Sequence, residues 1–234
     1  MTSKRADKMN GKIYLVGGSK GGVGKSMVTM ALLDHLRAQS APVLLIESDT
    51  SNPDVWKAYR DEVDAHLLNL DEANGWIELV NVLDANKDHV AVINTAARNN
   101  QGVSRYGDTL ASTLGELGRN LVTLWVVNRQ RDSLELLKEY MDAIPDSQVH
   151  VVRNGYFGEE EAFELYNGSK IRDAVEAKGG KSLTFPNLAD RVSDDIYTKR
   201  LSLAKAAKEL PIGNRAELRR WLTLTSGVFG EVVS

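Results

Sequence analysis

Short apolar runs alternate with helical patterns along most of the chain. The apolar runs, many of them rich in β-branched residues, predict strands over 12–16, 42–46, 90–93, 121–127, 148–152 and, more weakly, 182–185. Between them, apolar residues recur at helical spacing over 25–39, 54–60, 74–85, 107–118, 132–143 and 170–178. Continuous apolar strands separated by helices predict an α/β fold, a mostly parallel twisted sheet with helices on both faces.

Two further helices are predicted near the end of the chain. One covers 196–208, and the other begins after Pro211. Both carry basic side chains among their apolar residues: Lys199, Arg200, Lys205 and Lys208 in the first, and Arg215, Arg219 and Arg220 in the second. Acidic residues are mixed in with them. An ordinary solvated helix face is therefore one interpretation of this charge, and a basic binding surface is the other.

The first predicted strand leads through a glycine-rich segment into the first predicted helix. This segment is Ser19-Lys20-Gly21-Gly22-Val23-Gly24-Lys25-Ser26. Glycines let backbone N–H groups close around an anion, and the helix N-terminus adds partial positive charge, so the segment predicts a phosphate site. Lys25 would reach the β- and γ-phosphates of a nucleotide, and the Ser26 hydroxyl would bind Mg²⁺. A glycine-rich turn that holds no nucleotide is the alternative.

The loop is a variant of the common phosphate-binding motif. Ser19 stands where G-x-x-x-x-G-K-[ST] has its first glycine, whereas K-G-G-x-G-K-[ST] matches in full. This variant resembles the signature of the MinD/ParA family of ATPases, and the resemblance extends from residue 12 to about residue 222. It implies a P-loop ATPase in which ATP is held by Gly21, Gly22, Val23, Gly24, Lys25, Ser26 and Met27.

The resemblance also gives Lys20 a role of its own. It would be the signature lysine, a catalytic residue that reaches across a dimer interface to the ATP of the partner subunit. The implied assembly is a homodimer that forms when ATP binds. A solvated surface lysine is the alternative interpretation of Lys20.

Glu47 and Asp49 follow the second predicted strand and, being two residues apart, lie on the same face of it. The family usually has D-x-D at this place. By that resemblance Asp49 would orient the attacking water and belong to the metal site, and Glu47 would replace the first aspartate. The segment 49–53 also consists of residues that favour turns, so a turn that caps the next helix is the competing interpretation.

Asn94 follows the third predicted strand, where the family carries an aspartate that holds Mg²⁺ through water. An amide can accept a hydrogen bond from a metal-bound water but adds no negative charge. We therefore expect ATP binding with hydrolysis slowed by roughly one to two orders of magnitude, and a gain in turnover on Asn94→Asp. The predicted Mg²⁺ residues are Ser26, Asp49 and Asn94. The polar segment 98–107 is interpreted as a switch segment or as a long surface loop.

Three other loops carry expectations that come from the resemblance. Asn154 matches a family position that hydrogen-bonds the adenine edge, although Asn154-Gly155 is also a strong turn dipeptide. Pro186 and Asn187 stand where relatives offer backbone groups to the base. The loop 128–133 corresponds to a dimer-interface segment that often docks a partner, so we expect a small partner protein that regulates the ATPase.

Composition limits what else the chain can be. The 234 residues are 42% hydrophobic and suit a single domain, predicted over 11–234 after a flexible N-terminus over 1–10. That N-terminus lacks the apolar stretch of a secretory signal, and no run approaches the ~20 apolar residues of a membrane span, so no membrane contact is expected. Cysteine is absent, which excludes disulfides and thiolate-held clusters and suits a cytoplasmic location.

The formal net charge is −3, so any contact with nucleic acid must come from a local patch. In partition ATPases, basic residues in the C-terminal region of the dimer bind DNA without sequence preference. The function that the resemblance implies is an ATP-gated dimer switch in plasmid or DNA partition, or in DNA transfer. The alternatives are an ATP-dependent metabolic synthetase of the same superfamily and a non-hydrolysing ATP-bound scaffold, which Asn94 would favour.

Overall fold

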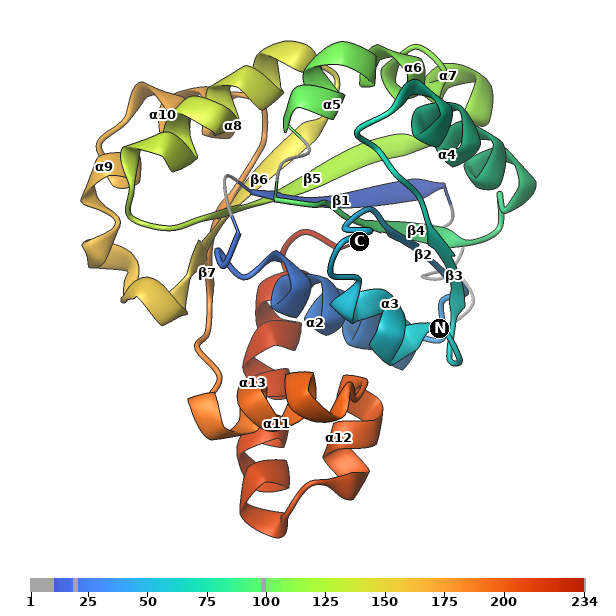
Figure 1. Ribbon diagram of the computed structural model, residues 1–234. Helices are drawn as coiled ribbons and strands as arrows, with labels where there is room; N and C mark the ends of the chain where they lie inside the picture. Colours follow the sequence, from blue (N-terminus) through green and yellow to red (C-terminus); the bar gives the residue numbers. More distant parts are fainter. Residues whose placement is uncertain (1–10, 19–20, 98–99, 234) are drawn as a thin grey trace.

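The computed structural model describes residues 11–18, 21–97 and 100–233, and within them it contains a seven-stranded sheet (Figure 1). The strand order is β3-β2-β4-β1-β5-β6-β7, and every neighbouring pair is parallel. The strands are β1 Lys12–Gly18, β2 Val43–Glu47, β3 Asp64–Leu67, β4 Val90–Asn94, β5 Asn120–Val127, β6 Gln148–Asn154 and β7 Ser182–Phe185. The predicted fold class is confirmed.

Helices cover both faces of this sheet (Figure 1). Successive residues of a strand point to opposite faces, so Tyr14 and Val16 of β1 join one core cluster and Ile13 and Leu15 join the other. The first cluster is closed by α2 Lys25–Ala38, α3 Asp54–Tyr59, α11 Asp190–Lys199, α12 Leu203–Glu209 and α13 Ile212–Gly230. The second is closed by α4 Ala73–Ala85, α5 Asn100–Tyr106, α6 Asp108–Ala111, α7 Leu114–Leu117, α8 Arg131–Ala143, α9 Glu164–Asn167 and α10 Lys170–Ala177.

The edge strand β3 lies outside the predicted strands. Its residues Asp64 to Leu67 are exposed at both ends and only partly buried between them. A strand that is paired on one side and solvated on the other needs no apolar run, so the hydrophobic pattern carries no signal for it.

Some helices differ in extent from the prediction. The helix predicted over 196–208 is two helices, because Arg200 adopts a left-handed conformation (φ 52°) that ends α11. The Ser202 side chain then caps α12 by accepting a hydrogen bond from the Lys205 N–H, at 3.2 Å. The predicted helix over 107–118 is likewise divided into α6 and α7, and the described part of the polar segment 98–107 contains α5.

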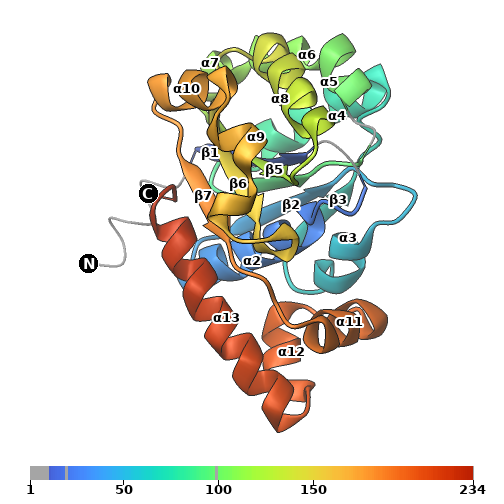
Figure 2. The same ribbon diagram turned by 90° about the vertical axis from the view of Figure 1, so that its left-hand side faces the viewer.

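The last helix, α13, runs diagonally past the end of β7 (Figure 2). Its Trp221 is fully buried, packs edge-on against Phe185 with ring centres 5.5 Å apart, and donates from Nε1 to the Pro186 carbonyl at 2.7 Å. These contacts hold the C-terminal helices against the carboxyl end of the sheet. Among the described helices, none combines the length and the apolarity needed to cross a membrane.

Candidate functional site

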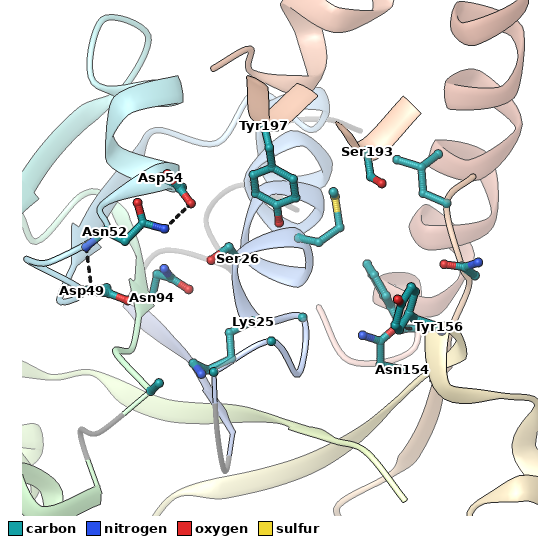
Figure 3. Close-up of a pocket in the computed structure, with 18 of the residues that line it drawn as sticks. Lys25, Ser26, Asp49, Asn52, Asp54, Asn94, Asn154, Tyr156, Ser193 and Tyr197 are labelled. Carbon is teal, nitrogen blue, oxygen red and sulfur yellow. Dashed lines mark hydrogen bonds between the residues drawn. The ribbon is translucent and has the colours of Figure 1, made fainter. Parts of the chain in front are cut away.

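A cavity of ≈ 520 Å³ opens at the carboxyl ends of the strands (Figure 3). Small-molecule sites usually measure about 300–1,000 Å³. The structure brings most of the predicted site residues together here: Gly21, Gly22, Gly24, Lys25, Ser26, Met27, Asp49, Asn94, Asn154 and Pro186 line the cavity. Val23 does not line it, because its side chain is buried in the core. Lys20 lies outside the described residues.

The glycine-rich turn has a backbone that favours glycine. Gly22 and Gly24 have positive φ angles, 77° and 102°. A Cβ at Gly24 would also lie 2.3 Å from Asn154 Nδ2 and would displace that buried amide. Helix α2 begins directly after the turn, and no side chain among the described residues caps its start. The first N–H groups of a helix lack intrahelical partners, so those of α2 are donors for an anion in the cavity.

Lys25 stands at the start of α2 and is only 7% exposed. Burial lowers its pKa to about 8, although Asp49 and Glu47 nearby favour its charged form. A buried lysine beside an uncapped helix start concentrates positive charge that an oligophosphate would neutralise. The residues of this part of the cavity therefore fit the β- and γ-phosphate end of a nucleotide.

Glu47 and Asn94 lie side by side on β2 and β4, at paired positions of the sheet, and both are buried. The Asn94 amide nitrogen donates to both Glu47 carboxylate oxygens, at 2.9 and 3.1 Å. Asn94 Oδ1 accepts from Thr29 Oγ1 at 2.9 Å, and the Asp49 N–H is a further donor to Glu47, at 3.0 Å. Burial raises the pKa of Glu47 to about 7, while the hydrogen bonds from Asp49 and Asn94 oppose this rise.

This contact changes the interpretation of Asn94. Asn94 lines the cavity whereas Glu47 does not, so the Asn94 amide lies between the buried Glu47 carboxylate and the cavity. An aspartate in place of Asn94 could not donate to Glu47 in this way unless it were protonated. The expected gain in turnover on Asn94→Asp rested on residue 94 alone, and the neighbouring carboxylate now opposes that single substitution.

Asp49 lies at the edge of the cavity, and its carboxylate also organises a turn. Oδ1 accepts hydrogen bonds from Ser51 Oγ at 2.6 Å and from the Asn52 N–H at 3.0 Å. Asp49 does not cap α3, whose first turn follows Pro53. The competing interpretation therefore holds for the turn itself but not for a cap by Asp49. The position of Asp49 at the cavity is the one that the water-orienting role requires. That role stays a prediction.

Asn154 lies across the cavity from Asp49 (Figure 3). Its Nδ2 donates to the Val23 carbonyl at 2.8 Å, and its Oδ1 accepts from the Tyr156 N–H at 3.1 Å. The side chain thus ties the phosphate loop to the end of β6 and also shapes the turn that follows. Its contact with adenine stays a prediction.

Pro186 lies at the same end of the cavity, and its carbonyl accepts the hydrogen bond from Trp221. Phe185 and Leu188, close to Pro186 in the chain, line the cavity as well, as does Met27. The cavity therefore has apolar as well as polar walls, and the apolar side chains suit the flat face of a base. The predicted contact between Pro186 and the base is untested by these observations.

Helix α11 supplies cavity residues that were not predicted, namely Asp190, Ser193 and Tyr197. Their spacing of three and four residues places them on one face of the helix, while Val192 and Ile196 are buried in the core. Polar residues along one helix face are also what any solvated helix shows, so the sequence alone does not distinguish this wall of the cavity.

The basic residues near the C-terminus are largely engaged within the chain. The ion pairs are Lys199–Asp195 at 2.7 Å, Lys205–Glu62 at 3.3 Å and Arg220–Glu217 at 2.7 Å. Arg215 also donates to the Lys208 carbonyl at 3.2 Å. Because these basic side chains are paired with acidic ones or with backbone, the interpretation of the two helices as one continuous basic surface is weakened.

A parallel sheet, a glycine-rich turn from β1 into α2 and a buried lysine in that turn together define a P-loop nucleotide-binding protein. The family model described as CobQ/CobB/MinD/ParA nucleotide binding domain matches residues 14–154, more than half of the chain. The chain belongs to this family, and the resemblance to MinD and ParA is confirmed.

Relatives agree with this assignment. Protein MobD of Acidithiobacillus ferrooxidans is 72% identical over 209 residues, which are 89% of this chain and 92% of that protein. The structure of MinD from Pyrococcus furiosus is similar with a TM-score of 0.57 and 16% identity, over 95% of this chain and 99% of that one. MinD from Aquifex aeolicus gives a TM-score of 0.54 at 14% identity, over 91% and 96% of the two chains. At such identities the solved structures support the fold alone.

Proposed function

We propose that this chain binds ATP together with Mg²⁺ and works as an ATP-gated homodimer that hydrolyses ATP slowly. The observation that supports this most is the buried Lys25 beside the uncapped start of α2, in a cavity of ≈ 520 Å³. Lys20 of each subunit would complete the site of the other. MinD of Aquifex aeolicus, which has a similar fold (TM-score 0.53), is seen in complex with MinC, and we propose a small regulatory protein partner for this chain too.

The residues present fit a metal ion that is held jointly with the nucleotide. Among the described residues, no group of three or more His, Cys, Asp or Glu could hold a metal ion. Mg²⁺ is usually bound by one or two carboxylates together with substrate phosphates, and Asp49 and the Ser26 hydroxyl line the cavity on the phosphate side. The Asn94 side-chain oxygen would accept a hydrogen bond from a metal-bound water. When bound, Mg²⁺ would neutralise charge that develops on the phosphate oxygens.

The chain's own side chains would then divide the work of hydrolysis. Lys25 stabilises negative charge on the phosphates. Asp49 orients the attacking water through Oδ2, while Ser51 and Asn52 hold Oδ1 in place. Asn94 contributes no charge to the cavity wall, and this is the reason for the slow rate that we propose. A non-hydrolysing scaffold differs from this account only in lacking the hydrolytic step, whereas a synthetase would also need a second small-molecule substrate.

Removing the Asp49 side chain should separate binding from hydrolysis. Asp49→Ala is expected to bind ATP within about threefold of the wild type, while phosphate release falls at least about a hundredfold, to background. Calorimetry with ATP and steady-state phosphate release measure the two effects. The matched control is Asp61→Ala, because Asp61 is a highly exposed carboxylate beyond α3. Hydrolysis by Asp49→Ala at the wild-type rate would remove Asp49 from the mechanism.

We further propose that the switch acts in DNA partition or transfer, with non-specific DNA as one partner. Because several basic side chains are paired within the chain, the candidates for contact are Arg200, Lys208 and Arg219, which have no ion-pair partner among the described residues. Arg200 follows α11, and the other two lie on α12 and α13, which project from the sheet side by side (Figures 1 and 2). Contacts to phosphates would weaken steeply as salt rises.

A further inference from the structure

Helix α11 forms a wall of the cavity away from the phosphate turn. Ser193 and Tyr197 lie one helical turn apart and line the cavity, whereas Val192 and Ile196 are 2% and 0% exposed and pack into the core. Tyr197 as a whole residue is 36% exposed. Its hydroxyl end points into the cavity, toward the side on which Ser26 lies (Figure 3). A side chain from the C-terminal helices thus faces the part of the site that the start of the chain builds.

Hydrogen bonds fix the segment between α11 and α12 to the core. The Leu203 N–H donates to the Tyr59 hydroxyl at 3.2 Å, and Tyr59 is fully buried. The Ser202 hydroxyl donates to Glu62 at 2.6 Å, and two basic side chains pair with the same carboxylate. The turn that follows Tyr197 is therefore held before any ligand arrives. A side chain that is already placed loses less freedom when a ligand binds.

The Tyr197 hydroxyl is a donor with no hydrogen-bond partner among the described residues. Burial, together with the nearby Asp54 carboxylate, raises the pKa of Tyr197 to about 12, so the phenol keeps its proton at neutral pH. A protonated phenol that faces a polar cavity can donate a hydrogen bond to an acceptor oxygen of a ligand. A nucleotide offers such oxygens on its ribose and on its phosphates.

We propose that Tyr197 is a nucleotide-binding residue whose hydroxyl donates a hydrogen bond to the sugar–phosphate part of the nucleotide in this cavity. This rests on the proposed function, because it requires a nucleotide in that place. The contact makes α11 part of the binding site.

Tyr197→Phe removes only the hydroxyl and tests this contact. By isothermal titration calorimetry, we expect its affinity for ADP to be about five- to tenfold weaker than that of the wild type. The thermal midpoint of the nucleotide-free variant should equal that of the wild type, since the hydroxyl holds nothing inside the protein. Tyr106→Phe, in α5 and away from the cavity, is the matched control and should change neither value.

The outcomes distinguish this inference from the proposed function. If the wild type binds ADP and Lys25→Met does not, then equal ADP affinities of Tyr197→Phe and the wild type overturn the inference alone. A lowered thermal midpoint with unchanged affinity overturns it too, because the hydroxyl would then be structural. A wild type that binds neither ADP nor ATP overturns the proposed function as well. A weaker affinity of Tyr197→Phe for ADP supports the contact. If its affinity for adenosine is equally weakened, the ribose accepts the hydrogen bond; if its affinity for adenosine is unchanged, a phosphate accepts it.

Discussion

Lys25→Met is expected to abolish nucleotide binding and, at the same time, to stabilise the nucleotide-free protein. Methionine is unbranched and similar in length to lysine, so the substitution keeps the apolar stem and removes the charge. Truncating one partner of a buried charged contact costs about 2–5 kcal/mol, so the affinity for ATP should fall by roughly 1.5 to 3.5 orders of magnitude. Isothermal titration calorimetry with ATP measures this loss. Lys87→Met, at an exposed lysine just after α4, is the matched control and should bind as the wild type does.

The gain in stability follows from the direction of the pKa shift. The folded-state pKa of Lys25, about 8, is below its ordinary value of 10.5. The unfolded chain therefore binds more protons between these pH values, and below them the charged lysine lowers the free energy of unfolding. Each pKa unit corresponds to ~1.4 kcal/mol. Because Asp49 and Glu47 favour the charged form of Lys25 and the substitution removes that attraction, we expect a smaller net gain of about 1–2 kcal/mol at pH 7.

Urea unfolding at several pH values measures this gain. It should shrink as the pH rises from 8 towards 10.5, where the wild-type lysine loses its proton in both states. A Lys25→Met variant that binds ATP normally and is less stable than the wild type at pH 7 would contradict both halves of the prediction. It would mean that the buried charge serves the fold and not a ligand.

Asn94→Asp alone is expected to destabilise the protein strongly, and Glu47→Gln is expected to rescue it. The single substitution sets a second carboxylate against Glu47 at a contact that now measures 2.9 Å, between two buried side chains. Two buried carboxylates at such range cannot both ionise without cost. We expect a loss of about 2–4 kcal/mol in the free energy of unfolding at pH 8. In the double variant the glutamine amide can donate to the new carboxylate, which removes the repulsion.

The pH dependence of the free energy of unfolding distinguishes the wild type, the two single variants and the double variant. The folded-state pKa of Glu47 is raised from 4.5 to about 7, so its ionised form costs stability above pH 7 and this cost disappears as the pH falls below 4.5. Glu47→Gln alone should therefore be more stable than the wild type at pH 8 and similar to it near pH 4.5. At pH 5, a protonated Glu47 can donate to the carboxylate of Asn94→Asp, so the single variant should lose less there than at pH 8.

Urea unfolding of the wild type, both single variants and the double variant forms a complete cycle. Additive effects at pH 8, with no rescue, would contradict a direct contact between the two side chains. The double variant also carries a carboxylate on the cavity wall, and no second buried carboxylate lies beside it. The expected rise in ATP turnover and tighter Mg²⁺ dependence therefore belong to Glu47→Gln/Asn94→Asp, where phosphate release across a Mg²⁺ titration measures them.

Much of the fold was accessible from the sequence because its central strands are buried on both faces. Such strands must be apolar throughout, and the glycine-rich turn after β1 has positive φ angles that restrict its composition. The edge strand β3 could not be found in this way, since one of its sides is solvated. The break between α11 and α12 does have a local signal, because Ser202 is a good cap residue, but the helical pattern continues across it.

The candidate site was predictable where one residue type has one role, as with Lys25 and Ser26 in the turn. Contacts between side chains that are distant in sequence were not predictable. Glu47 and Asn94 meet because β2 and β4 are neighbours in the sheet, and the strand order is not written in the sequence of either strand. Tyr197 reaches the cavity through the packing of α11, which its own polar pattern does not reveal.

The most direct test of the ATP-gated dimer is the mass of the protein in solution, measured by light scattering without nucleotide, with ADP and with ATP·Mg²⁺. We expect the 25.8 kDa monomer in the first two conditions and twice that mass with ATP. Lys20→Ala should bind ATP and remain monomeric, whereas Lys87→Ala should dimerise as the wild type does. A wild type that binds ATP by calorimetry and keeps the same mass in all three conditions would contradict the account.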